Sequence, residues 1–131
     1  MLLVHASPIE PERWHYLHGL ADIDEHFAAF AERMCFVGHS HRTGIYAIEA
    51  DGNVTRRQGR VPLHPERRYL VNVGSVGQSR DRDPRAAYVI YDAQDASVEV
   101  CRVAYPLEKT QARMRAANIP DFLVDRLGAG V

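Results

Sequence analysis

The sequence has 131 residues, of which 46% are apolar and 25% charged, and its formal net charge is −1. This composition is that of an ordinary globular domain, so it excludes a disordered or fibrous chain and argues against a general nucleic-acid binder. No apolar run has the length of a membrane span, and no signal-peptide pattern opens the sequence. Cys35 and Cys101 lie in apolar segments, so we expect reduced core residues in a cytoplasmic protein.

The first third of the chain is predicted to hold two short buried strands and one helix. Residues 2–4 and 35–37 are continuous apolar runs followed by turn-forming residues, which is typical of strands buried on both faces. Between them, acidic residues at positions 24 and 25 begin a predicted helix whose apolar spacing extends to Met34.

The remaining chain is predicted to form hairpins and then two helices. A turn at Asp51–Asn53 indicates a first hairpin, and the strand over 69–73 ends at a glycine-rich loop. Residues 87–103 form a second hairpin, and helices follow over 106–117 and 121–127. The sequence therefore predicts an α/β layered domain, which we treat as one unit because no linker or repeat interrupts it.

Three of the seven histidines share a setting that suits metal binding. His5 follows the first strand, and His39 and His41 follow the second strand after Gly38. If these strands are parallel neighbours, their carboxyl ends open on one side, where ligands bind in open α/β sheets. In extended backbone a His-x-His pair places both imidazoles on one face, and neutral imidazole binds zinc, manganese and iron. Such a pair also arises by chance in a histidine-rich chain, so histidines that bind nothing remain the alternative.

The charged segment 80–85 and the glycine-rich loop before it carry weaker signals. Arg80, Arg82 and Arg85 could hold phosphate oxygens with their forked guanidinium groups, or pair with neighbouring aspartates in a solvated loop. Ser75 does not stand in the pattern of a hydrolase nucleophile, and no helix start follows the loop to complete a phosphate site.

Several segments together resemble the C-terminal half of the calcineurin-like metallophosphoesterases. The resemblance rests on Val4–Pro8, Phe36–Arg42, Val71–Gln78 and the arginine-rich segment 80–86. It is nearest to the bacterial and archaeal branch often labelled diadenosine tetraphosphatase-like or protein-phosphatase-like, and it runs over nearly the whole chain. It implies the C-terminal half of a four-layer αββα sandwich, with a mixed sheet, flanking helices and two metal ions at the strand ends.

The resemblance also implies roles for individual residues. His5 and His39 match ligands of one metal ion, and His41 matches a ligand of the other. The ions would be manganese, iron or zinc, which would lower the pKa of a shared water and clamp phosphoryl oxygens. Arg80 and Arg85 are candidates for substrate contact. A structural role near the site is implied for Gly38, Asn72, Gly74 and Ser75.

The family's earlier motifs, Asp-x-His, Gly-Asp and Gly-Asn-His, are absent, so no catalytic residue is assigned. We expect a metal-dependent phosphoesterase, or hydrolase of nucleotide polyphosphates, that is inactive without an N-terminal half. Its substrate would be a phosphorylated small molecule or phosphoprotein, with no membrane or nucleic-acid partner. Because a lone half would expose a sheet edge and face, we expect a fragment of a longer product, or a chain that pairs with another copy or with a separate N-terminal half. The alternatives are a non-catalytic remnant that binds a metal or partner, and an assembly module whose histidines bind nothing.

Overall fold

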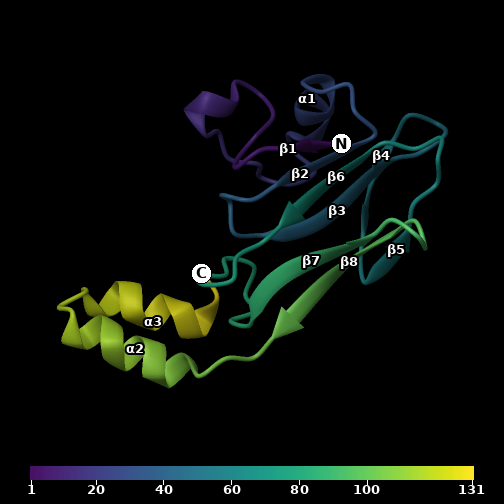
Figure 1. The fold of residues 1–131 in the computed structure, drawn as a ribbon. Coiled ribbons are helices and arrows are strands. Elements are labelled where there is room, and N and C mark those ends of the chain that lie inside the picture. The colour runs from purple at the N-terminus through teal and green to yellow at the C-terminus, as the bar shows by residue number, and fades with distance from the viewer.

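Two β-sheets pack face to face in the computed structural model, which describes residues 1–131 (Figure 1). The five-stranded sheet has the order β1-β2-β6-β3-β4. Its strands are β1 (Leu2–Leu3), β2 (Met34–Val37), β3 (Thr43–Ile48), β4 (Val54–Arg57) and β6 (Tyr69–Val73). The three-stranded sheet has the order β5-β8-β7. Its strands are β5 (Arg60–Pro62), β7 (Ala86–Asp92) and β8 (Ser97–Val103).

The five-stranded sheet is mixed, and its parallel part positions the histidines. β1 pairs with β2 in parallel, with Leu2 opposite Cys35, and β2 pairs with β6 in parallel, with Cys35 opposite Leu70. β3 then lies antiparallel to β6. The carboxyl ends of β1, β2 and β6 therefore meet at one edge of the sheet, which confirms the predicted α/β arrangement.

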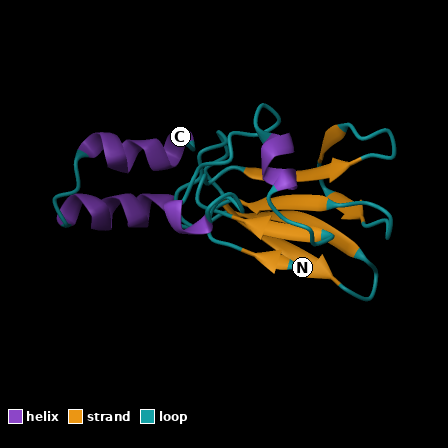
Figure 2. Cartoon of the chain, turned by 90° about the horizontal axis from the view of Figure 1, so that it is seen from above, coloured by secondary structure: helices purple, strands orange, loops and turns teal.

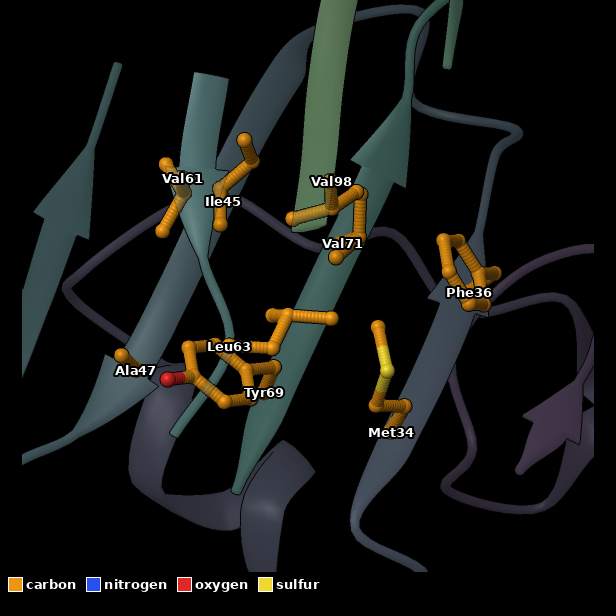
Figure 3. Packing of buried hydrophobic residues seen from close by; sticks show 9 residues of the cluster. All are labelled: Met34, Phe36, Ile45, Ala47, Val61, Leu63, Tyr69, Val71 and Val98. Carbon is orange, nitrogen blue, oxygen red and sulfur yellow. The ribbon is translucent and has the colours of Figure 1, made fainter. Parts of the chain in front are cut away.

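Both faces of the central strands β2 and β6 are buried, which explains their largely apolar sequences. The edge strand β1 differs from the prediction of burial on both faces, because its Leu3 is 68% exposed. One face packs on the three-stranded sheet, and its cluster includes Phe36 and Val71 together with Val98 of β8 (Figure 3). The alternate residues Cys35 and Leu70 face a second cluster formed with α1 (Ile23–Ala28) and the loop before it. Each fully buried aliphatic side chain contributes about 1.5 to 3 kcal/mol to folding.

Two helices form an antiparallel pair that extends away from the sheets (Figure 2). They are α2 (Leu107–Ala116) and α3 (Asp121–Ala129). After α3, the carbonyl of Gly130 accepts a hydrogen bond of 2.8 Å from the Arg82 amide, which fixes the C-terminus to the segment 80–85. Gly130 has a φ of 65°, and an added Cβ would lie 2.8 Å from the Asp83 nitrogen, so only glycine fits. No helix combines the length and apolar character that crossing a membrane requires.

Two elements differ from the sequence-based prediction. α1 ends at Ala28 instead of reaching Met34, which begins β2. The Arg68 guanidinium donates to the carbonyl oxygens of Phe27 and Phe30 and lies 4.7 Å from the Phe30 ring centroid, so it holds the chain in a turn there. The short strand β5 was not predicted, because a three-residue strand has no measurable periodicity.

Candidate metal centre

The loops that follow β1 and β2 bring two of the predicted histidines into contact. The Gly38 amide donates to the His5 carbonyl at 2.9 Å and so joins the two loops. Nε2 of His5 lies 3.2 Å from Nδ1 of His39, and the ring centroids are 5.1 Å apart. Both rings border one pocket of about 480 Å³, which His41 also lines. The structure thus places all three predicted histidines at one pocket.

The backbone of the His-x-His segment is not extended, contrary to the sequence-based expectation. His39 and His41 have φ values of 59° and 58°, in the left-handed region that few non-glycine residues adopt. The shared pocket therefore results from two consecutive tight bends and not from strand alternation. Such strain persists only where the surrounding structure imposes it, and it is common at functional sites.

Asn72 and Gly74 hold this strained segment against β6. The fully buried Asn72 donates from Nδ2 to Ser40 Oγ at 2.6 Å, and its Oδ1 accepts from the Gly74 amide at 3.1 Å. Ser40 lies between the two histidines of the motif. Gly74 has a φ of 77°, and an added Cβ would lie 2.6 Å from Thr43 Cγ2, so a larger residue does not fit. Ser75 Oγ accepts from the Gly77 amide at 3.2 Å, which leaves it a loop-forming residue.

Two exposed aromatic residues pack on the paired imidazoles. The Trp14 ring centroid lies 4.8 Å from that of His5, and the Tyr16 centroid lies 4.5 Å from that of His39. The sequence shows both residues in a loop, but no local signal indicates that the loop folds onto the histidines. These aromatic contacts orient the two rings.

The environment favours the neutral form of His39 and His41. Burial lowers the pKa of His39, and the neighbouring His5 and Arg80 lower it further. Burial also lowers the pKa of His41, and Arg80 adds to the effect. Neutral imidazole is the form that binds a metal ion, so the lowered pKa values favour metal binding by both side chains at neutral pH.

The donor atoms fit part of a metal site. Two nitrogens bound to one ion at about 2.1 Å lie about 3 to 3.4 Å apart, which matches the observed distance between His5 and His39. Nδ1 of His41 is buried without a hydrogen-bond partner. No group of three or more histidine, cysteine, aspartate or glutamate side chains with metal-binding geometry is present. The chain therefore offers imidazole ligands but no complete ligand set.

The two predicted substrate-binding arginines lie in different places. The Arg80 amide donates to the His41 carbonyl at 3.0 Å, so this residue lies beside the histidines. Arg85 forms an ion pair of 2.6 Å with Asp83 and lines a separate pocket that contains none of the three histidines. The structure brings Arg80 but not Arg85 to the site, and a substrate role stays a prediction for both.

Comparison with known proteins supplies two informative relatives and one remote one. No protein-family model matches the sequence. The chain is 35% identical over 130 residues to the uncharacterized protein MJ0912 of Methanocaldococcus jannaschii, with 99% of this chain and 51% of that protein covered. It superposes on a metallophosphoesterase from Sphaerobacter thermophilus with a TM-score of 0.83 and 38% identity, covering 98% of this chain and 54% of that one. The chain also shares its fold with the hypothetical protein PH1004 of Pyrococcus horikoshii. The TM-score is 0.69 at 18% identity, and the match covers 98% of this chain and 46% of that one. The chain thus spans about half the length of the relatives it matches.

Proposed function

Because the chain folds as the C-terminal half of a calcineurin-like metallophosphoesterase, we propose that it supplies the histidine side of a phosphoesterase site. The observation that carries this proposal is the 3.2 Å contact between the His5 and His39 ring nitrogens at the shared edge of three parallel strands. The side chains come from distant parts of the chain and meet where ligands bind in sheets of this type.

In this proposal His5 and His39 hold one divalent ion, and His41 holds a second. Manganese, iron or zinc suits these ligands, and such an ion lowers the pKa of its bound water and stabilises charge on phosphoryl oxygens. Trp14 and Tyr16 orient the imidazoles, and Arg80 offers a cationic donor to a phosphate oxygen beside them.

The residues of this chain leave the proposed site incomplete, because no carboxylate joins the imidazoles. We therefore propose that the chain by itself does not hydrolyse phosphoesters and that the remaining ligands come from an N-terminal half. The relatives, which are about twice as long, have room for such a half.

A chimera tests this proposal. This chain replaces the matching segment of the Sphaerobacter thermophilus protein, and hydrolysis of bis(p-nitrophenyl) phosphate is measured with Mn²⁺. We expect hydrolysis by the chimera, none by the chain alone, and background rates for His39→Ala. His64→Ala is the matched control, since His64 is exposed and lines a different pocket. A folded chimera that binds Mn²⁺ but does not hydrolyse the ester would rule out the proposed phosphoesterase function.

The contact between the His5 and His39 ring nitrogens also suits a second candidate, a non-catalytic remnant that binds one metal ion. Three imidazoles are sufficient for a single zinc ion, and in this candidate His41 would have to complete the pair, since the three histidines form no metal-binding group in the structure. This candidate predicts one zinc per chain by elemental analysis and an inactive chimera. If His39→Ala changes neither metal content nor thermal stability, both candidates fail and the histidines bind nothing.

A further inference from the structure

A second pocket next to the histidines is lined by four arginines. It has a volume of about 460 Å³, and Arg42, Arg56, Arg80 and Arg82 all border it. The only acidic residue in its lining is Asp81. The carboxylate oxygens of Asp81 already accept hydrogen bonds from Ser79, from Thr43 and from Arg102. The pocket therefore carries a net positive charge that the protein itself does not neutralise.

None of these four arginines forms an ion pair. Arg56 donates to the Thr43 carbonyl at 2.8 Å, while the guanidinium groups of Arg42 and Arg82 make no hydrogen bond within the protein. Nη2 of Arg80 donates to Gln78 Oε1 at 3.3 Å, whereas its Nε is buried and has no hydrogen-bond partner. The exposed guanidinium groups of Arg42 and Arg82 therefore have donors free for the oxygens of an anion in the pocket.

The arginine pocket is continuous with the histidine cluster. A smaller cavity of about 210 Å³ shares Arg42, Arg80, Leu17 and His18 with the arginine pocket. This cavity is also lined by Tyr16, which packs on His39, and by Ser40, which lies between His39 and His41. One ligand can therefore reach from the imidazoles into the arginine pocket.

We propose that the arginine pocket binds a second phosphate group of the substrate. The substrate is then a compound with two phosphate groups, of which one lies at the imidazoles and the other is held by Arg42, while Arg80, which borders both cavities, lies between the two phosphates. Forked guanidinium donors match phosphate oxygens in geometry and charge. This inference rests on the proposed function for the first phosphate, whereas the anion affinity of the pocket does not depend on any metal ion.

Calorimetric titration of this chain with inorganic pyrophosphate, in metal-free buffer, tests the pocket directly. A pH of about 8 keeps the imidazoles neutral, so they do not act as cations. We expect binding by the wild-type chain and an affinity about tenfold lower for Arg42→Gln, because each charge-assisted pair to phosphate is worth roughly one decade. The matched control is Arg113→Gln, which removes the same charge from an exposed position on α2. The double variant Arg42→Gln/Arg80→Gln should show no detectable binding.

Two further measurements separate this inference from the proposed function. His39→Ala should lose metal binding but keep the wild-type affinity for pyrophosphate, since His39 does not line the arginine pocket. The inference is overturned if the wild-type chain does not bind pyrophosphate, if Arg42→Gln binds as tightly as wild type, or if Arg113→Gln weakens binding equally. An inactive chimera whose pyrophosphate binding still depends on Arg42 contradicts the proposed function alone.

Discussion

A buried histidine fixes the loop that carries His5. Nδ1 of His26 lies 2.8 Å from Ser7 Oγ, and its Nε2 lies 3.3 Å from an Asp22 carboxylate oxygen. Ser7 Oγ also accepts from the Ile9 amide at 2.8 Å. The order of groups resembles a Ser-His-Asp triad, but Ser7 has no exposed surface and cannot reach a substrate. The network instead joins α1 to the segment just after His5.

Removing this imidazole should destabilise the protein. In His26→Ala, Ser7 and Asp22 lose their buried partner, and the free energy of unfolding in urea should fall by about 1 to 3 kcal/mol. His15→Ala removes an exposed imidazole from the neighbouring loop and should change the free energy by no more than about 0.5 kcal/mol. Equal unfolding midpoints for His26→Ala and wild type would show that the network adds no stability.

Individual site residues could be predicted from sequence only where a local pattern marks them. His5, His39 and His41 are marked because each follows an apolar strand. Trp14 carries no such mark, since its contact with His5 depends on how a long loop folds back. The same holds for Arg42, which lies in the loop before β3, because Arg56 comes from β4 and the pocket between them exists only in the folded chain.

At the scale of elements, Asp81 connects the loop that carries it with the strands β3 and β8 beside the site. Its carboxylate accepts from the Thr43 amide at the start of β3, from Ser79 and from Arg102 on β8. Burial raises the pKa of Asp81, but the hydrogen bonds from Ser79, Thr43 and Arg102 outweigh burial and bring the pKa far below its ordinary value. The ionised carboxylate therefore stabilises the folded protein.

This lowered pKa makes stability depend on pH in acid. Above the ordinary aspartate pKa the full contribution of Asp81 is present, and it is lost as the pH falls through the lowered pKa of the folded state. We expect the free energy of unfolding in urea to decline between about pH 5 and pH 2, and Asp81→Asn to flatten that decline. Asp24→Asn, at an aspartate without ion pairs or side-chain hydrogen bonds, should leave the slope unchanged. If the free energy of unfolding of Asp81→Asn declined with falling pH as steeply as that of the wild type, Asp81 would not be the source of the acid dependence.

Elements with strong periodicity or clear turn residues could be predicted well. The strand β6 begins and ends at the predicted residues, because the loop at Gly74 ends it. The length of α1 could not be predicted, since the Arg68 guanidinium that holds the following turn lies some forty positions further along the chain. Tertiary contacts thus determine where a helix such as α1 ends when the helix propensity of the local sequence does not.

On the scale of the whole molecule, the outer face of the three-stranded sheet stays uncovered. Cross-strand pairing places Tyr88 opposite Cys101, and Ile90 opposite Glu99, on the face away from the core. Cys101 is therefore only half-buried and is not the core residue that the sequence predicted, unlike the buried Cys35. Tyr88, Ile90 and Val103 are 41%, 49% and 48% exposed. An apolar sheet face of this kind is typical of a surface that another protein covers.

We expect the isolated chain to self-associate through this face at micromolar concentration. Ile90→Lys places a charge at its centre and should shift sedimentation velocity profiles toward the monomer. Gln94→Lys adds the same charge in the exposed turn between β7 and β8 and serves as the control. A wild-type chain that sediments as a monomer would remove the basis for this expectation.

The parallel edge of the five-stranded sheet also sets the order in which the protein can assemble. Leu2 pairs with Cys35, and Cys35 pairs with Leu70. Each pairing closes a long loop, and the chain loses conformational entropy on closure before the side chains of the sheet can pack and offset that loss. Such topologies refold slowly, whereas the local pairing of α2 with α3 needs no long loop. Trp14 is the single tryptophan and touches His5, so its fluorescence reports the step at which the histidines first meet. We therefore expect the pocket around them to form late in refolding, after the pairing of α2 with α3.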